Sequence, residues 1–234
     1  MDKLAGLPAG EEKRVAVRRM FDRIAPRYDL LNRILSLRLD VGWRREALRF
    51  LALTPRDTLL DLACGTGDFL ALAAPSGART LGADFSEGML REARRRRVPG
   101  VLLQADAARL PLSDGAVTAI SCGFALRNFV RLEDVLAEIA RVLAPGGRMA
   151  LLEVDEPETC FMRRGHAVYF NRIVPLIGGL LSDRDAYRYL PRSVAYLPPE
   201  REMLALIARL GFTRVSKRRL SGGIAQLLTA ERER

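Results

Sequence analysis

Between residues 58 and 154, short apolar runs alternate with stretches in which apolar residues recur at every third or fourth position. The short runs predict strands and the periodic stretches predict helices. Strands are expected at 58–62, 79–83, 101–105, 117–121 and 148–154, and helices at 68–74, 87–97 and 132–143. This alternation favours an α/β fold of the Rossmann-like kind, with a parallel sheet and helices on both faces. The carboxyl ends of the strands, and a ligand crevice, are then expected at one edge.

The chain on either side of this alternation is predicted to extend and close the fold. Apolar residues recur with helical spacing between residues 11 and 24, and Pro26 is expected to interrupt that first helix. Behind the alternation, a helix is expected at 200–210, and strands at 212–220 and 223–230 around a Ser-Gly-Gly turn. The sheet would then have seven strands, most of them parallel.

The 234 residues and the apolar fraction of 49% fit a single globular domain. Residues 1–13 are expected to form a flexible tail and residues 14–234 the domain, which begins with a helical extension at 14–54. An apolar, aromatic stretch at 156–199 is expected to cover the active site, with ordinary helix packing as the alternative. No apolar run reaches the roughly 20 residues of a membrane span, so we expect a cytoplasmic protein, either free or peripheral at the inner membrane face.

Cysteine usage and charge exclude some kinds of site but do not select one binding partner. Cys64, Cys122 and Cys160 are odd in number and lack C-x-x-C spacing, and His166 is the only histidine. Neither a disulfide framework nor a metal site is therefore expected. The net charge of +10 and the run Arg94-Arg95-Arg96-Arg97 are compatible with nucleic acid, anionic lipid or an anionic substrate, or with a solvated helix end.

A glycine-rich turn, with the sequence DLACGTGD at residues 61–68, directly follows the first predicted strand and precedes a predicted helix. Gly65 and Gly67 allow a close backbone approach and positive φ angles, and the helix N-terminus can face a polar ligand. The third glycine of a dinucleotide-binding fingerprint is replaced by Leu70. Taken alone, this turn is compatible with either NAD or S-adenosylmethionine (SAM).

Acidic residues at successive strand ends favour SAM. Asp84 ends the second predicted strand, where a carboxylate can accept hydrogen bonds from ribose hydroxyls. Asp61 can pair with the methionyl ammonium, and Asp106 can accept from the adenine amino group with the Ala107 N–H opposite N1. Three carboxylates fit a cationic cofactor better than an anionic dinucleotide. The predicted SAM-binding residues are Asp61, Gly65, Thr66, Gly67, Asp84, Phe85, Met89, Asp106, Ala107 and Ser121.

Several segments resemble the ubiquinone/menaquinone biosynthesis C-methyltransferases. They are FDRIAPRYDLLN at 21–32 with Trp43-Arg44, GFALRNF at 123–129, YRYLPRS at 187–193 and LSGGIA at 220–225. The resemblance implies a class I methyltransferase fold and SAM-dependent C-methylation of a polyprenylated quinol. Demethylmenaquinol is the first expected substrate. The family's Glu-Phe-x-x-Pro run is here EVDEP at 153–157, which changes the expected pocket near Asp155.

The chemistry points to residues outside the glycine turn. A quinol carbon ortho to a hydroxyl becomes nucleophilic when that hydroxyl loses its proton, and the ring must be aligned with the methyl donor. Arg127 is the candidate for stabilising phenolate charge and Asn128 for orienting the ring oxygen, with a loop salt bridge and a helix cap as structural alternatives. Tyr28 and Asp29 are expected to line the site. The general base stays open among Tyr28, Asp29, His166, Asp155 and a water molecule.

The expected partner is a lipid bilayer, because a polyprenyl tail is too apolar to stay in water. The basic charge would help the protein to dock on anionic lipids. A benzoquinol of the ubiquinone pathway, an RNA methyltransferase prompted by the charge, and a non-catalytic SAM-binding subunit remain alternatives. No nucleic-acid partner is expected, because no added RNA-binding module is visible. The sequence leaves open whether the chain forms a homodimer.

Overall fold

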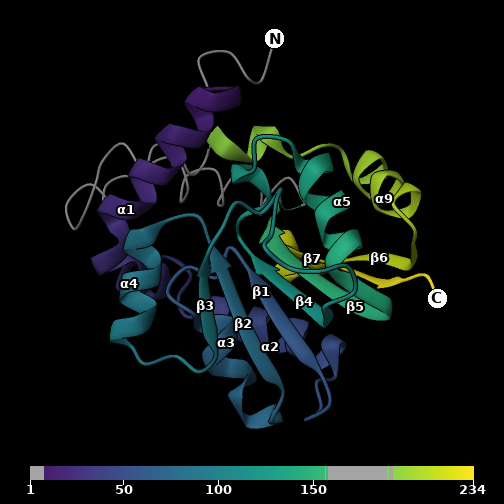
Figure 1. The fold of residues 1–234 in the computed structure, drawn as a ribbon. Coiled ribbons are helices and arrows are strands. Elements are labelled where there is room, and N and C mark those ends of the chain that lie inside the picture. The colour runs from purple at the N-terminus through teal and green to yellow at the C-terminus, as the bar shows by residue number, and fades with distance from the viewer. Residues whose placement is uncertain (1–7, 156, 158–188, 190–191) are drawn as a thin grey trace.

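The computed structural model describes residues 8–155, 157, 189 and 192–234. A seven-stranded sheet in the order β3-β2-β1-β4-β5-β7-β6 forms its centre (Figure 1). The strands are β1 (Thr58–Leu62), β2 (Arg79–Asp84), β3 (Val101–Gln104), β4 (Val117–Gly123), β5 (Leu143–Val154), β6 (Phe212–Leu220) and β7 (Ala225–Arg232). β1 to β5 are parallel, whereas β7 runs antiparallel between β5 and β6. The predicted Rossmann-like fold with seven strands is confirmed.

Helices cover both faces of this sheet. The described helices are α1 (Gly10–Leu35), α2 (Leu39–Leu51), α3 (Asp68–Ala73), α4 (Glu87–Arg95), α5 (Leu132–Val142) and α9 (Glu200–Arg209), and short 3₁₀ turns include η2 (Leu126–Asn128), η4 (Val194–Tyr196) and η5 (Ser221–Gly223). α2 and α3 pack on one face through Trp43, Ala47 and Phe69. α5 and α9 pack on the other through Leu136 and Ile207. α1 crosses the carboxyl edge of the strands and packs against α4 (Figure 1).

Strand β5 differs most from its predicted bounds. It begins at Leu143 instead of residue 148, because the Pro-Gly-Gly segment expected to form a separate turn lies inside the strand. The register with β4 shifts there, from Val117 opposite Leu143 to Ala119 opposite Arg148. Gly146 has a φ of +75° in this irregular stretch. A glycine can adopt that angle without steric cost, so the strand continues across the distortion.

Helix α1 corrects two expectations. It begins at Gly10, so residues 10–13 belong to the helix and not to a flexible tail, and Lys13 is buried. It also runs through Pro26 without interruption. Proline in a helix interior costs about 3 kcal/mol. Buried residues on both sides of it, Ile24 and Leu31 among them, anchor the helix and offset that cost.

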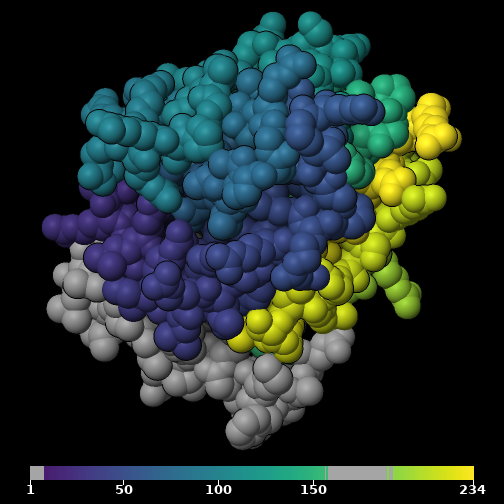
Figure 2. Space-filling model, turned by 90° about the horizontal axis from the view of Figure 1, so that it is seen from below, coloured from purple at the N-terminus to yellow at the C-terminus, as the bar shows by residue number. Residues whose placement is uncertain are grey.

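The N-terminal extension is joined to the C-terminal strands. Trp43 Nε1 on α2 donates to Ser221 Oγ at 2.9 Å, and Arg218 on β6 pairs with Glu46. Figure 2 shows the N-terminal residues, from purple to blue, beside the C-terminal residues in yellow. The cover predicted at 156–199 lies largely outside the described residues. Within the described residues, no helix combines the length and apolarity needed to cross a bilayer.

Candidate functional site

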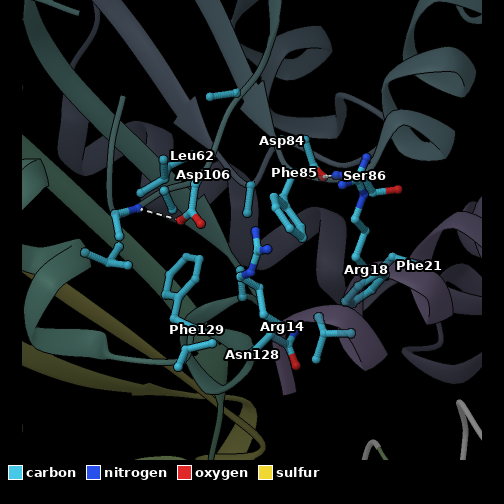
Figure 3. Close-up of a pocket in the computed structure, with 18 of the residues that line it drawn as sticks. Arg14, Arg18, Phe21, Leu62, Asp84, Phe85, Ser86, Asp106, Asn128 and Phe129 are labelled. Atoms are coloured by element: carbon cyan, nitrogen blue, oxygen red, sulfur yellow. Dashed lines mark hydrogen bonds between the residues drawn. The ribbon is translucent and has the colours of Figure 1, made fainter. Parts of the chain in front are cut away.

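A cavity of about 280 Å³ lies at the carboxyl ends of β1, β2 and β4, under helix α1 (Figure 3). One half of its wall comes from the strand ends and the loops after them, including Ala63, Gly65, Asp84 and Ala107. The other half comes from α1 and from the loop between β4 and α5. The position matches the crevice expected from the parallel topology.

Asp84 is the central polar group of the strand-end half. Its Oδ2 accepts a hydrogen bond from Gly65 N at 2.8 Å, and its Oδ1 accepts one from Ser86 N at 2.8 Å. Gly65 has a φ of +55°, and a Cβ built there meets no atom within 4 Å, so the turn leaves open space. Burial raises the pKa of Asp84 to about 6. This carboxylate is held at the cavity by two backbone donors and can still accept further hydrogen bonds.

Phe85, Met89, Asp106 and Ala107, four of the residues predicted to bind SAM, also line the cavity. The ring of Phe85 forms part of the wall, and buried Met89 on α4 forms another part. Asp106 Oδ1 accepts a hydrogen bond from Ala108 N at 3.0 Å, which fixes the turn after β3 (Figure 3). These four residues surround the place where the cofactor's adenosine was expected.

Asp61 and Ser121 lie below the glycine turn and do not line the cavity. Both are buried, and Ser121 Oγ donates to Asp61 Oδ1 at 2.8 Å. Burial raises the pKa of Asp61 to about 8, so the carboxyl group holds its proton more tightly than an exposed one. This position does not support the expected contact of Asp61 with the ligand ammonium. Asp61 instead connects β1 to β4 under the turn.

Thr66, Gly67 and Asp29 form the back of the turn and do not line the cavity either. Asp29 Oδ1 accepts from Thr66 Oγ1, and its Oδ2 accepts from Arg96 Nη1 at 2.7 Å. Gly67 has a φ of +86°, and a Cβ there would lie 2.8 Å from Val98 Cγ1, so only glycine fits. The prediction that Asp29 lines the site is wrong, because its carboxylate ties α1 to the glycine turn.

Arg127 is likewise part of the scaffold. It is buried, and its guanidinium pairs with the fully buried Glu153 and donates to Ser193 Oγ at 3.1 Å. It is absent from the described residues that line the cavity. The role predicted for it, direct stabilisation of phenolate charge, is not supported by this position. The alternative, a salt bridge within the loop, is what the structure contains.

Asn128 lines the cavity and has an unusual environment. Its Nδ2 lies 3.4 Å from Phe124 O, whereas its buried Oδ1 has no hydrogen-bond partner in the described part of the chain. An unsatisfied buried acceptor costs about 1–3 kcal/mol, so such groups call for an explanation. A ligand that donates a hydrogen bond in the cavity would provide one.

Lys13 fixes the loop that carries Asn128. Its Nζ donates to Arg127 O at 2.9 Å and to Phe129 O at 2.7 Å, and it lies 3.4 Å from the centre of the Tyr196 ring. Burial lowers the pKa of Lys13 to about 8. This lysine thereby joins α1, η2 and η4, and it holds the backbone on both sides of Asn128.

Tyr28 is the one candidate base among the described residues that lines the cavity. Its ring meets that of Phe21 edge-on, with centroids 6.0 Å apart. Burial raises the pKa of Tyr28, so the hydroxyl keeps its proton near neutral pH. Asp155 pairs with Lys217 Nζ at 2.9 Å and with Arg219. His166 lies outside the described residues.

Sequence reasoning placed Tyr28 at the site but missed the contribution of Arg14 and Arg18, on the same helix, to the cavity wall. Arg14 and Arg18 reach over the ring of Phe85, with guanidinium carbons 5.3 and 5.0 Å from its centroid (Figure 3). The helical spacing predicted α1, but arginines on a helix ordinarily mark its solvated face. Ser86 had a detectable signal, because a serine before an acidic helical turn is typical of an N-cap. It accepts from Met89 N at 3.1 Å and donates to Asp22 Oδ1 at 2.6 Å.

The basic run at 94–97 is mostly neutralised. Arg94 pairs with Glu87 at 2.9 Å, Arg95 with Glu92 at 2.7 Å, and Arg96 with Asp29 and Asp68. This pairing weakens the argument from the run to an anionic partner. Among the described residues there is no group of three or more His, Cys, Asp or Glu side chains that could hold a metal ion.

The cavity fits SAM. Asp84 and Asp106 place carboxylates at successive strand ends, and Gly65 leaves room for a close approach of the ligand to the backbone. In the opposite wall, the buried Oδ1 of Asn128 has no hydrogen-bond partner among the described residues and is free to accept one. The site thus offers acceptors to a cationic cofactor on one side and an acceptor to a second ligand on the other.

Comparison with known proteins agrees with this geometry. The model of the "ubiE/COQ5 methyltransferase family" matches residues 8–232. The demethylmenaquinone methyltransferase of Thermus thermophilus is 43% identical over 221 residues, which cover 91% of this chain and 100% of that protein. The ubiquinone/menaquinone biosynthesis C-methyltransferase UbiE of Syntrophotalea carbinolica is 43% identical over 217 residues, or 90% and 91% of the two chains. The magnesium protoporphyrin IX methyltransferase of Synechocystis PCC 6803, solved with bound SAH, shares the fold at 19% identity (TM-score 0.61; 94% of this chain, 100% of that one).

Proposed function

The chain belongs to the ubiE/COQ5 methyltransferase family and is a SAM-dependent methyltransferase, and from this premise we propose that it methylates a ring carbon of a polyprenylated quinol. Demethylmenaquinol is the substrate that we place first, because the relative from Thermus thermophilus carries that specificity in its name. A ubiquinone-pathway benzoquinol is the second candidate, supported by the name of the Syntrophotalea relative.

The observation that carries this proposal is the unsatisfied Oδ1 of Asn128 in the cavity wall. A quinol ring hydroxyl is a donor, so it can make the hydrogen bond that Asn128 lacks. That bond would hold the hydroxyl of the ring in one position and draw its proton away from the oxygen. The backbone bonds from Lys13 to Arg127 O and Phe129 O keep Asn128 fixed while the ring binds.

The remaining wall suits an aromatic ring. Phe21, Phe124 and Phe129 line the cavity and can exclude water from its apolar part. Electrostatic interactions are stronger where water is excluded. Tyr28 keeps its proton because its pKa is raised, so its hydroxyl can donate to an oxygen on which negative charge develops.

The cofactor would occupy the strand-end half. Asp84 would accept hydrogen bonds from its ribose hydroxyls, and the buried backbone at Ala107 would face the adenine edge. When bound, SAM supplies a sulfonium methyl group that is open to in-line attack by a carbon nucleophile. The protein's own task is then to align the ring carbon with that group. Alignment of two reactants contributes roughly 7–11 kcal/mol in oriented intramolecular reactions.

We further propose that the substrate is taken from a bilayer, since its tail is apolar, and that the protein meets the membrane as a peripheral protein. Its net charge of +10 supports attraction to anionic lipids. The pairing of Arg94, Arg95 and Arg96 within the chain argues against an RNA-binding role for that run.

The test is methyl transfer from labelled SAM to reduced demethylmenaquinol, to a benzoquinol counterpart and to bulk RNA in parallel. Transfer to the naphthoquinol is expected to exceed the other two, and no transfer to either quinol would refute the proposal. Asn128→Ala should lower kcat about 100-fold, since an orienting hydrogen bond is lost in a dry site, with SAM affinity within about twofold. Asn128→Asp retains an acceptor and should keep more activity than Asn128→Ala.

A further inference from the structure

Exposed apolar residues gather at one corner of the molecule. Four of the seven exposed large hydrophobic residues in the described chain fall within residues 30–39. They are Leu30, Ile34, Leu37 and Leu39, with 59%, 38%, 76% and 42% of their surface exposed. We call these four residues the α1–α2 patch. Isolated exposed leucines need no explanation, but a cluster of this kind marks an interaction surface.

The patch has a defined shape. Leu30 and Ile34 are four positions apart on α1, so they lie on the same face of the helix. The turn to α2 then carries Leu37 and Arg38 in the left-handed region, with φ angles of 51° and 64°. Leu37 N donates to Ile34 O at 3.2 Å, which holds the turn closed. A left-handed conformation costs a leucine about 1–2 kcal/mol, so the side chain is kept at this exposed tip against a local penalty.

The charged side chains within the patch segment are all basic. Residues 30–39 contain Arg33 and Arg38 and no acidic residue. The next residue, Asp40, is buried and bonded to Arg33 and Arg44, so it does not offset the charge of exposed Arg38. The run at 94–97 is different, because acidic partners on α4 and the glycine turn neutralise most of it. Arg38 has no acidic partner among the described residues, and exposed leucines beside such an arginine are typical of segments that lie in a membrane interface.

The patch shares helix α1 with the cavity wall. Tyr28 lines the cavity, and Leu30 follows it by two positions on the same helix. In Figure 2 the surface of the N-terminal residues, in purple, lies along one edge of the molecule. A bilayer touching this edge would therefore contact the helix that forms the cavity wall.

We propose that the α1–α2 patch docks on a bilayer of anionic phospholipids, with its leucines among the acyl chains and Arg38 among the headgroup phosphates. The proposal rests on the proposed function, because a quinol with an apolar tail must be collected from a membrane. According to this proposal, membrane binding depends on the α1–α2 patch and not only on the net charge of the whole protein.

The test measures partitioning of the full-length protein to vesicles of phosphatidylglycerol and phosphatidylcholine by co-sedimentation. Leu30→Glu combined with Leu37→Glu should weaken partitioning at least about tenfold, because both apolar contacts are lost and two charges that anionic lipid repels are added. Val101→Glu is the matched control, since Val101 is 57% exposed on β3, away from the patch, and partitioning should change less than about twofold.

A second variant separates docking from folding. Leu37→Gly removes the apolar side chain and relieves the left-handed strain, so it should raise Tm while lowering partitioning about threefold. A fall in both quantities would mean that Leu37 serves the fold and would overturn its assignment to the membrane.

The electrostatic part is tested with matched arginines. Arg38→Gln should weaken partitioning about fivefold at low salt and little at high salt, whereas Arg95→Gln, the same loss of charge at an arginine paired with Glu92, should have little effect. Equal losses in both variants would show that net charge alone drives binding and would overturn the assignment.

Failure of this proposal can be told apart from failure of the proposed function. The Leu30→Glu, Leu37→Glu variant should retain methyl transfer to a short-tailed demethylmenaquinol in solution and lose it with a long-tailed quinol in vesicles. Unchanged vesicle binding with normal turnover would refute the patch and leave the function standing. Wild-type protein that binds vesicles but methylates neither quinol would do the reverse. Lipid-free sedimentation showing that the variant breaks a dimer would assign the patch to a second copy of the chain.

Discussion

The two halves of the cavity are built in different ways. In the strand-end half, polar groups come directly from the ends of strands, and Asp84 faces the cavity while backbone donors from Gly65 and Ser86 hold it. In the half formed by α1 and the β4–α5 loop, most charged groups are used to hold elements together. Arg127 pairs with Glu153, and Lys13 binds two backbone carbonyls. Asn128 and Tyr28 line the cavity there, together with charged residues of α1 that include Arg14 and Arg18.

This difference separates two tasks. A cofactor with several polar groups needs several fixed partners, and parallel strands supply them at a common edge. An apolar quinol needs a dry pocket with few polar groups, placed accurately by a rigid surround. In the proposed function, the buried ions of the second half would act on the reaction through Asn128, by fixing the loop that carries it.

The largest expected effect tests whether Arg127 belongs to the scaffold. Arg127→Ala leaves the carboxylate of Glu153 buried without its cation, so the free energy of unfolding in urea should fall by about 3–5 kcal/mol. Replacing both partners, Arg127→Met with Glu153→Met, should recover most of that loss. If Arg127→Ala has the wild-type free energy of unfolding but a much lower kcat, the guanidinium contacts the substrate. Both halves of the cavity would then present charged groups to a ligand.

The sequence supported the first half better than the second, for a physical reason. Parallel strands force their carboxyl ends to one edge, so the positions of Asp84 and Asp106 followed from hydrophobic runs alone. Asp61 is in the same pattern, but its neighbour Ser121 comes from a different strand, and only the packed sheet shows that they bond to each other. Local spacing carries no information on such a pairing.

The second half depends on contacts between distant segments. Arg127 pairs with Glu153 on β5. Lys13 donates to carbonyls more than a hundred positions away, and Arg127 O is 114 positions from it in the sequence. The helical period of α1 was visible, but not that Pro26 would be carried inside it or that its arginines would cover Phe85. Motif resemblance selected the loop at 123–129, and of its two candidates the structure places Asn128 and not Arg127 in the cavity wall.

A smaller effect tests the role of Asp84 in the strand-end half of the cavity. Asp84→Ala should weaken SAM binding about 100-fold in calorimetry, equivalent to roughly 2.7 kcal/mol, because two ribose hydroxyls and the Gly65 N–H lose their acceptor. Turnover at saturating SAM should change much less. Asp61→Asn is the control, since the amide oxygen can still accept from Ser121, and the affinity of this variant for SAM should stay within about threefold of the wild type. If both variants lose the same SAM affinity, the ammonium contact predicted for Asp61 from the sequence is supported.

The pH dependence of SAM binding should also report on Asp84. Donation from ribose hydroxyls favours the ionised carboxylate, and the pKa of Asp84 is raised to about 6. Protonation therefore competes with binding, and affinity should fall as the pH drops below about 6, by up to roughly tenfold per pH unit. The Asp84→Asn variant should lack this slope. A slope that persists in the variant would assign it to another group.

The smallest effect lies where the two halves meet, at the contact of Arg18 with the ring of Phe85. A partly exposed cation–π contact contributes about 0.5–1 kcal/mol, so Arg18→Gln should weaken SAM binding roughly threefold by loosening the Phe85 wall. Arg18 Nε also lies 3.9 Å from Asp22 Oδ2, so the contact must be isolated in a double-mutant cycle with Phe85→Leu. Arg19→Gln on the same helix controls for charge. A coupling energy of zero would mean that α1 covers the cofactor by shape alone, and the two halves would then share no contact beyond packing.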